Sequence, residues 1–253
     1  MAEKKQPNAH EQVKEIEISP SASTIHDAIK KEGESQLERS TFNLFWSGLA
    51  AGLSMSLSMI VEGILEAYLP YAEWTVLISS FGYTLGFVIV ILGKQQLFTE
   101  NTLKPVLPLL HDKTLQKFWN VMRLWGVVLF ANLLGTLLVA LVVAHTSAFE
   151  PHVLETFAKL GHEAMKPGFD TVLLRGIFAG WLIALMVWLL PDAGTMRVWI
   201  IILVTYVVAI GHFSHVIAGS METFTIAAMG ETSWSNVLLN YTLPALIGNI
   251  LGG

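Results

Sequence analysis

After residue 40, long runs of apolar residues alternate with short polar segments. Six of these runs predict membrane-spanning helices, because about 20 apolar residues are needed to cross the hydrocarbon core. Glycine and polar residues interrupt the second and the fifth run. The pattern therefore predicts an all-α membrane protein in which helices 2 and 5 are broken. The predicted segments are residues 42–66, 74–110, 118–145, 171–190, 198–229 and 234 onward.

The two interruptions have a similar composition. The first is Gly-Lys-Gln-Gln-Leu-Phe-Thr at residues 93–99, and the second is Gly-His-Phe-Ser-His-Val-Ile-Ala-Gly at residues 211–219. Non-helical backbone at membrane depth is tolerated only where it is buried in protein or lines a cavity, so the breaks predict a solute pathway. We expect half-helices to begin near Glu100 and Ser220 and to turn unpaired N–H groups toward the membrane centre, which favours an anion there.

Short motifs recur in the same order in the two halves of the chain. Ser-Gly-Leu-Ala-Ala-Gly at residues 47–52 is similar to Arg-Gly-Ile-Phe-Ala-Gly at residues 175–180. Ala-Asn-Leu-Leu-Gly and Gly-Asn-Ile-Leu-Gly carry Asn132 and Asn249, which follow Thr99 and His215 at nearly equal intervals. Three helices in each half predict two inverted three-helix repeats with a substrate site near the membrane midplane. The structural residues of the broken helices are then predicted to be Gly93, Gly219, Asn132 and Asn249.

Composition supports a membrane protein and narrows its function. The chain is 53% hydrophobic and 14% charged, with a mean hydropathy of +0.56, whereas a soluble domain carries more charge. Its net charge of -5 provides no basic surface, so nucleic acid is not an expected partner. There are no cysteines, no phosphate loop and no nucleophile with an adjacent base, so neither an enzyme nor a cofactor is expected. His212 and His215 have no evident third ligand, so no metal site is predicted.

The first forty residues are polar and predict a cytoplasmic tail ahead of a transmembrane domain at residues 41–253. Residues 21–39 have the pattern of an amphipathic helix near the membrane surface; a solvated, partly disordered lead-in is the alternative. Because the last segment ends in two glycines without a flanking charge or aromatic anchor, we expect the sixth helix to continue beyond this sequence. The positive-inside rule predicts a multi-pass protein with a cytoplasmic N-terminus. The positive residues that set this orientation are Lys30, Lys31, Arg39, Lys104, Lys113, Lys117, Arg123 and Arg197.

Titratable residues within the predicted spans suggest how an anion crosses. His215 lies at the second break and is suited to donating a proton to a weak-acid anion, which crosses an apolar constriction at lower cost when neutral. Glu222 either pairs locally or deters anions, and Glu62 and Glu66 are expected at the membrane interface. Thr99 is expected to line the pore; it could also cap the half-helix that begins near Glu100, and the two roles are compatible.

Several motifs together resemble the formate/nitrite transporter family, and within it the YfdC-like branch of inner membrane proteins. They are Gly-Tyr-Thr-Leu-Gly at residues 82–86, the first break with the following Glu-Asn, residues 125–135, Phe-Ser-His at residues 213–215 and residues 243–253. The resemblance covers nearly everything after the polar tail. It implies a homopentamer in an inner membrane, with one aquaporin-like pore in each protomer and a small anion as substrate.

The resemblance also implies roles for individual residues. Leu97, Phe98 and Thr99 match the loop at the cytoplasmic constriction, Tyr83 matches an aromatic residue at the periplasmic constriction, and His215 matches the central pore histidine. Lys166 resembles the vestibule lysine after a shift of two positions. The chain departs from the family at Gly180, where the family often has Asn, at Gly219, where it usually has Asn, and at Val208, which replaces a gate aromatic. Polarity is added at Lys94, Gln95 and Glu222, where related proteins are plainer.

The leading hypothesis is a channel or proton-coupled transporter for small monovalent anions of weak acids. One alternative is a pore for other small solutes, although the twin Asn-Pro-Ala signature of water channels is absent. The other alternative is a membrane sensor or scaffold that acts through its tail and transports nothing. Flux that survives deletion of residues 1–40 would argue against the last alternative.

Overall fold

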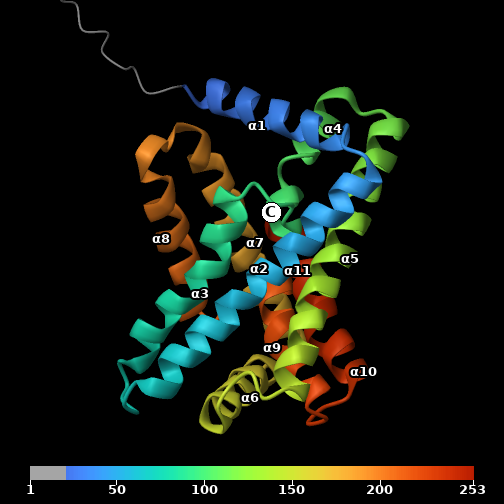
Figure 1. Cartoon of the computed structure of the whole chain (residues 1–253). Coiled ribbons are helices and arrows are strands. Elements are labelled where there is room, and N and C mark those ends of the chain that lie inside the picture. The colour runs from blue at the N-terminus through green and yellow to red at the C-terminus, as the bar shows by residue number, and fades with distance from the viewer. Residues whose placement is uncertain (1–20) are drawn as a thin grey trace, which may run out of the picture.

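The computed structural model describes residues 21–253, which form helices joined by short loops (Figure 1). Helix α1 lies across one end of the molecule, and α6 and α10 lie at the opposite end. The part of the tail before residue 21 lies outside the described residues. The elements are α1 Ala22–Leu37, α2 Thr41–Tyr68, α3 Thr75–Leu92, a 3-10 helix Phe98–Thr102, α4 Val106–Asp112, α5 Leu115–His145, α6 Pro151–Met165, α7 Phe169–Leu189, two 3-10 turns Leu190–Asp192 and Gly194–Met196, α8 Arg197–Ile210, α9 Val216–Ala228, α10 Trp234–Val237, a π-helix Leu238–Thr242 and α11 Leu243–Gly252.

Four of the described helices are long and apolar enough to cross a membrane. They are α2, α3, α5, and α7 with the turn that follows it. Helices α8 and α9 are apolar but shorter, and the last apolar segment divides into α10, the π-helix and α11. The predicted second and fifth segments are indeed interrupted, because α3 ends at Leu92 and α8 at Ile210.

The starting points of the half-helices differ from the prediction. After the first break the chain forms a 3-10 helix from Phe98, and Glu100 lies inside it. After the second break α9 begins at Val216, one turn earlier than the predicted start near Ser220. The reason is local. His215 has extended backbone angles, and its side chain accepts the backbone N–H of Ala218, so it acts as the N-cap.

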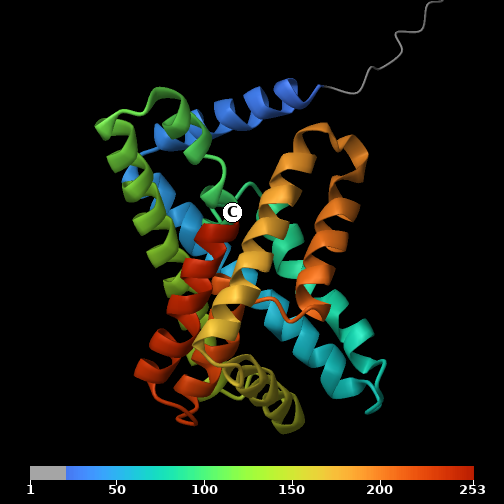
Figure 2. The same cartoon turned by 180° about the vertical axis from the view of Figure 1, so that it is seen from behind.

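Glycines allow the closest helix crossings. Helix α2 packs on α5 at Gly52, where an added Cβ atom would overlap the backbone carbonyl of Asn132. Helix α7 packs on α11 in the same way, because a Cβ atom at Gly180 would overlap the backbone carbonyl of Asn249. Figure 2 shows α7 beside α11 from behind. This packing explains why an asparagine cannot occupy position 180 of this chain without moving a helix.

Substituting Gly180 therefore tests the helix crossing. We expect Gly180→Ala to destabilise the protein by about 1–3 kcal/mol, because the added methyl group must push α11 away from α7. Gly126→Ala is the matched control, since nothing lies within 4 Å of a Cβ atom at this helical position. Thermal unfolding of the detergent-solubilised protein measures both. Equal melting temperatures for the two variants would contradict the proposed steric role.

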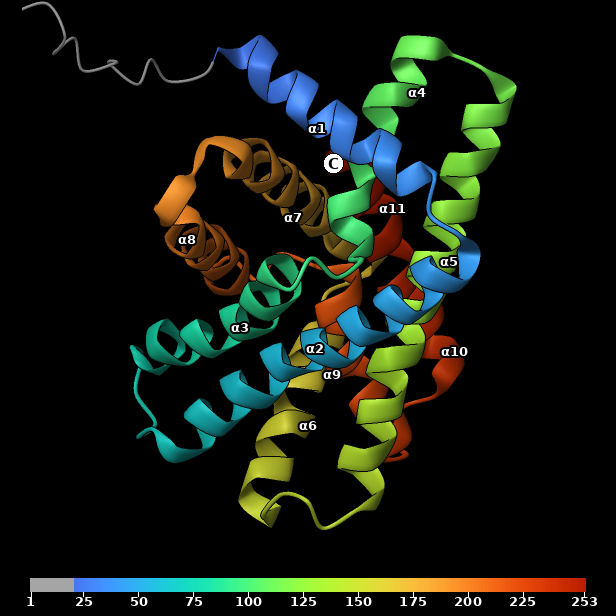
Figure 3. The same cartoon turned by 45° about the horizontal axis from the view of Figure 1, so that its top comes forward.

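Helix α1 packs on the protein through its apolar side. Ile29 and Leu37 are buried, and the backbone of Gly33 lies directly against the carbonyl of Lys104. The Lys104 Nζ atom is 2.9 Å from a carboxylate oxygen of Glu32 in α1. The predicted amphipathic helix is thus present, but α4, α5 and α7 cover part of its apolar side, where the sequence suggested a membrane surface (Figure 3).

Candidate functional site

Asn132 in α5 holds the first break in place. Its Oδ1 atom accepts the N–H of Phe98 at 2.9 Å, and its Nδ2 atom donates to the carbonyls of Gly48 at 2.7 Å and Gln96 at 2.9 Å. The Asn132 side chain is fully buried. It therefore replaces hydrogen bonds that the interrupted backbone cannot make within a helix.

Asn249 in α11 does the same for the second break. Its Oδ1 atom accepts the N–H of Val216 at 2.8 Å, and its Nδ2 atom donates to the carbonyls of Gly176 at 2.9 Å and Ser214 at 2.8 Å. The two asparagines thus have equivalent partners in the two halves of the chain.

The equivalent hydrogen bonds correct the register of the repeat. Because Phe98 and Val216 donate to the two asparagines, the residue equivalent to His215 is Leu97 and not Thr99. Lys94 and His212 are also equivalent, and both adopt a left-handed backbone with φ of 50° and 48°. Helix α8 thus ends before His212, so His212 and His215 do not share a helical face. The sequence comparison aligned Thr99 with His215 because both are polar residues at a break, and this alignment is wrong by two residues.

Thr99 and His215 connect the two breaks directly. The Thr99 Oγ1 atom lies 2.8 Å from His215 Nε2, and both residues are buried. Since Nδ1 of His215 accepts the N–H of Ala218, the neutral ring carries its hydrogen on Nε2 and donates it to Thr99. Thr99 makes no helix-capping hydrogen bond, so the capping role is wrong. The Phe87 ring packs against the imidazole, with centroids 5.0 Å apart.

The predicted residues beside this junction are also buried. Leu97 and Phe98 precede Thr99, and the edge of Phe98 packs against Trp125 with ring centroids 6.0 Å apart. Trp125 in turn donates its indole N–H to the carbonyl of Asn101 at 2.7 Å. The first break is therefore held by aromatic packing and hydrogen bonds from α5.

The N-terminus of α9 is occupied by side chains. Asn249 accepts the N–H of Val216, and His215 accepts that of Ala218. The sequence predicts that these N–H groups are unpaired and available to an anion. The structure contradicts this for the two N–H groups named, so charge recognition must involve other groups.

A cavity of about 530 Å³ opens between both halves of the chain. Ser214 and Gly219 contribute to its wall, so the cavity reaches the residues that flank the His215 turn. The predicted residues Tyr83, Val208 and Lys166 also line it. We refer to this cavity as the vestibule. Its titratable residues are Glu62, Glu66, Tyr83, Glu163, Lys166, Arg175, His212, Glu222 and Tyr241.

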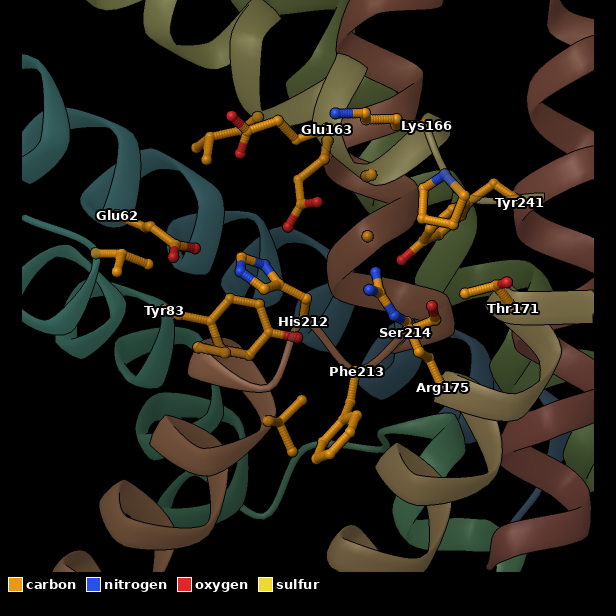
Figure 4. Close-up of a pocket in the computed structure, with 18 of the residues that line it drawn as sticks. Glu62, Tyr83, Glu163, Lys166, Thr171, Arg175, His212, Phe213, Ser214 and Tyr241 are labelled. Carbon is orange, nitrogen blue, oxygen red and sulfur yellow. The ribbon is translucent and has the colours of Figure 1, made fainter. Parts of the chain in front are cut away.

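Charged groups of both signs line the vestibule. In Figure 4, Glu62 and Arg175 lie on opposite sides with His212 between them, whereas Glu163 and Lys166 lie next to each other at the top of the view. The left-handed backbone of His212 helps to place this side chain between Glu62 and Arg175. The vestibule therefore offers two basic groups that attract an anion and several carboxyl groups that repel one when ionised.

Only some of the vestibule carboxylates form ion pairs. Lys159 lies 2.6 Å from Glu66 and 3.9 Å from Glu163, and the hydrogen bond to Glu66 raises the pKa of Lys159. Glu62 and Glu222 form no ion pair with any described residue. The sequence expectation that Glu62 and Glu66 face the membrane interface is wrong, because both line the vestibule.

Tyr241 occupies the space next to Gly219. A Cβ atom at residue 219 would overlap the Tyr241 hydroxyl group, so a larger residue fits there only if the tyrosine moves. This pairing gives a physical reason for the glycine where the family has asparagine. The sequence analysis missed Tyr241 and Arg175 as vestibule residues. Arg175 had a signal, since a charged residue within a predicted span usually faces a protein interior, whereas nothing distinguished Tyr241.

Among residues 21–253, no three His, Cys, Asp or Glu side chains are grouped as a metal site requires. The side chains that line the vestibule offer charges, protons and hydrogen bonds. A small anion fits this chemistry beside Arg175 and Lys166.

Comparisons with known proteins agree with this architecture. The model of the family "Formate/nitrite transporter" matches residues 23–253. The chain is 38% identical over 252 residues to inner membrane protein YfdC of Escherichia coli, covering 100% of this chain and 81% of the relative. A solved pentameric formate channel with formate bound superposes with a TM-score of 0.70 at 20% identity, over 84% of this chain and 92% of that chain. A solved FNT family ion channel superposes with a TM-score of 0.76 at 17% identity, over 91% of this chain and 94% of that chain.

Proposed function

Because the chain belongs to the formate/nitrite transporter family, it is a membrane channel or transporter for small anions, and we propose that its substrates are monovalent anions of weak acids. The observation that carries this proposal is the hydrogen bond between Thr99 and His215, which joins the two breaks beside a vestibule with two basic side chains. Formate and nitrite are the first candidates, given the names of the family and of one solved neighbour.

The proposed path runs from the vestibule to the opposite end of the molecule. Lys166 and Arg175 attract the anion, and Tyr83 and Val208 narrow the vestibule. Beyond them, the Thr99–His215 junction offers a hydroxyl group and an imidazole. Leu97 and Phe98 form the apolar narrowing on the cytoplasmic side. Since burying a charge in an apolar narrowing is costly, the solute passes there as the neutral acid.

The arrangement in the membrane is part of the same proposal. Six spans in two inverted repeats would place the breaks near the midplane, and the matching roles of Asn132 and Asn249 support this repeat. The N-terminal tail of residues 1–40 is proposed to be cytoplasmic, because positive residues gather at that end. By analogy with the pentameric neighbour and with inner membrane protein YfdC, the protein would be a homopentamer in an inner membrane.

Reconstitution of the wild-type protein tests the function. Proteoliposomes are given inward gradients of formate, nitrite, acetate or hydrosulfide, with protein-free liposomes as the background and glycerol as a neutral solute. We expect saturable uptake of at least one anion well above background. Glycerol uptake alone would instead favour a pore for other solutes, and a folded pentamer that moves none of the four anions would contradict the proposal.

A further inference from the structure

We propose that Glu62 and Glu222 form a carboxyl pair that shares one proton in the vestibule. The pair must hold this proton when an anion enters, and it then transfers the proton to the anion. This inference rests on the proposed function and assigns the source of the proton. It concerns a pair of residues on α2 and α9, two helices that contact each other.

The position of Glu62 points to a role in the vestibule. Its side chain is only 9% exposed, forms no ion pair within the described part of the chain, and is directed into the vestibule in Figure 4. Glu222 lines the same vestibule and lies on α9, which packs against the α2 helix that carries Glu62. No cationic side chain of the described residues forms an ion pair with Glu62 or Glu222, so their ionised forms repel each other without compensation from such a pair.

The other charged and titratable groups of the vestibule are less suited to supplying the proton. Glu66 and Glu163 are both within ion-pair distance of Lys159, on the rim of the vestibule. Arg175 lies across the space from Glu62 with His212 between them, and Lys166 lies beside Glu163 at the top of the view. Tyr83 and Tyr241 also face the vestibule and are neutral groups near pH 7.

An anion and a doubly ionised carboxyl pair exclude one another. An anion held by Arg175 and Lys166 lies in the same vestibule as Glu62 and Glu222, where repulsion is stronger than in bulk water. Entry of the anion is therefore favoured when the carboxyl pair holds one proton. By thermodynamic linkage, protonation of the pair strengthens anion binding by the same factor.

The proton then moves from the pair to the anion. A carboxyl O–H bond of Glu62 or Glu222 breaks, an O–H bond forms on the weak-acid anion, and the electron pair stays on the carboxylate. The neutral acid continues past the Thr99–His215 junction, and the pair takes a new proton from the solution that fills the vestibule. Every atom and charge is accounted for without another reactant.

His215 is a poorer source of this proton. Its Nδ1 atom accepts the N–H of Ala218 and thus carries no hydrogen. Its Nε2 hydrogen is directed at Thr99, and loss of this hydrogen would leave an imidazolate anion. The sequence hypothesis that His215 donates the proton therefore gives way to a hydrogen-bonding role for His215.

The experiment measures formate uptake and proton uptake together in proteoliposomes that contain a pH-sensitive dye. External pH is varied from about 5 to 8 for the wild type and for Glu62→Gln/Glu222→Gln, at a fixed formate concentration. We expect one proton per formate in the wild type and flux that falls up to about tenfold per pH unit where one protonation limits entry. In the double variant we expect at least a tenfold lower flux at pH 6 and a change of less than twofold over the pH range.

Control variants separate this role from a structural one. Glu155→Gln removes an exposed carboxyl group of α6 that does not line the vestibule and should keep the wild-type pH slope. Glu62→Asp and Glu222→Asp keep a carboxyl group and should retain the slope even where flux falls. Size-exclusion chromatography verifies the assembly of each variant.

The outcomes are distinguishable. If the assembled double glutamine variant keeps the wild-type pH slope, at full or at reduced flux, the proton-sharing pair is wrong while the proposed function stands. If the wild-type protein moves no anion, both the proposed function and the pair are wrong.

Discussion

Asn249→Leu is expected to destabilise the protein by about 3–6 kcal/mol, because three buried backbone groups lose their hydrogen-bond partner at once. Leucine has a similar size, so the loss does not come from a cavity. The N–H of Val216 and the carbonyls of Gly176 and Ser214 would remain away from water without replacement partners. Thermal unfolding of the detergent-solubilised protein and the yield of assembled protein measure this loss.

The equivalent variant and a surface control make this test specific. Asn132→Leu should cost about as much as Asn249→Leu, since Asn132 also makes three hydrogen bonds to backbone groups around a break. Asn240→Leu should change stability by no more than about 0.5 kcal/mol, because Asn240 is exposed and its side chain bonds only to Asn236. If Asn249→Leu has a melting temperature close to that of Asn240→Leu, the second break does not need the hydrogen bonds of Asn249 for its stability.

The helical architecture was largely predictable because the membrane imposes simple rules on the sequence. Apolar runs of sufficient length gave the spans, and glycine followed by polar residues gave the ends of α3 and α8. The start of α9 was not predictable in this way. Histidine is an uncommon N-cap, so nothing in the sequence marked His215 as the residue before the helix.

The vestibule was predictable only in part, because its wall is built from many elements. Lys166 follows α6, Arg175 lies in α7 and Tyr241 lies in the π-helix, so their meeting depends on how the helices cross. The overlap of Gly219 with the Tyr241 hydroxyl is likewise a result of packing between segments. Sequence spacing reports which residues share a helix face, and it does not report which faces meet.

The vestibule contains carboxyl groups as well as the basic residues that would attract an anion, and this combination needs an explanation. Four carboxyl groups in the entrance of an anion pathway are unfavourable if all are ionised. Lys159 lies within 4 Å of Glu66 and Glu163 and offsets one of their two negative charges, and a proton shared between Glu62 and Glu222 would remove one more. The basic residues then remain as the groups that attract an anion.

Variants at the junction are expected to reduce anion flux by about tenfold or more, which corresponds to about 1.4 kcal/mol in the barrier. His215→Asn keeps a side chain that can cap α9, because asparagine is a preferred N-cap, but its amide is too short to replace the imidazole contact with Thr99. Flux should therefore fall while the melting temperature changes little. His215→Ala removes both functions and should also destabilise the protein by about 1 kcal/mol.

Thr99→Val tests the same hydrogen bond from its other side. Valine has nearly the shape of threonine but no hydroxyl group, so the variant leaves the Nε2 hydrogen of His215 without its hydrogen-bond partner. If the junction acts as a unit, the double variant Thr99→Val/His215→Asn should lose little more flux than either single variant, because one hydrogen bond is removed only once. Uptake of formate by reconstituted protein measures all three. Full flux in an assembled Thr99→Val protein would place the path of the anion away from this junction, and multiplicative losses would mean that Thr99 and His215 act independently.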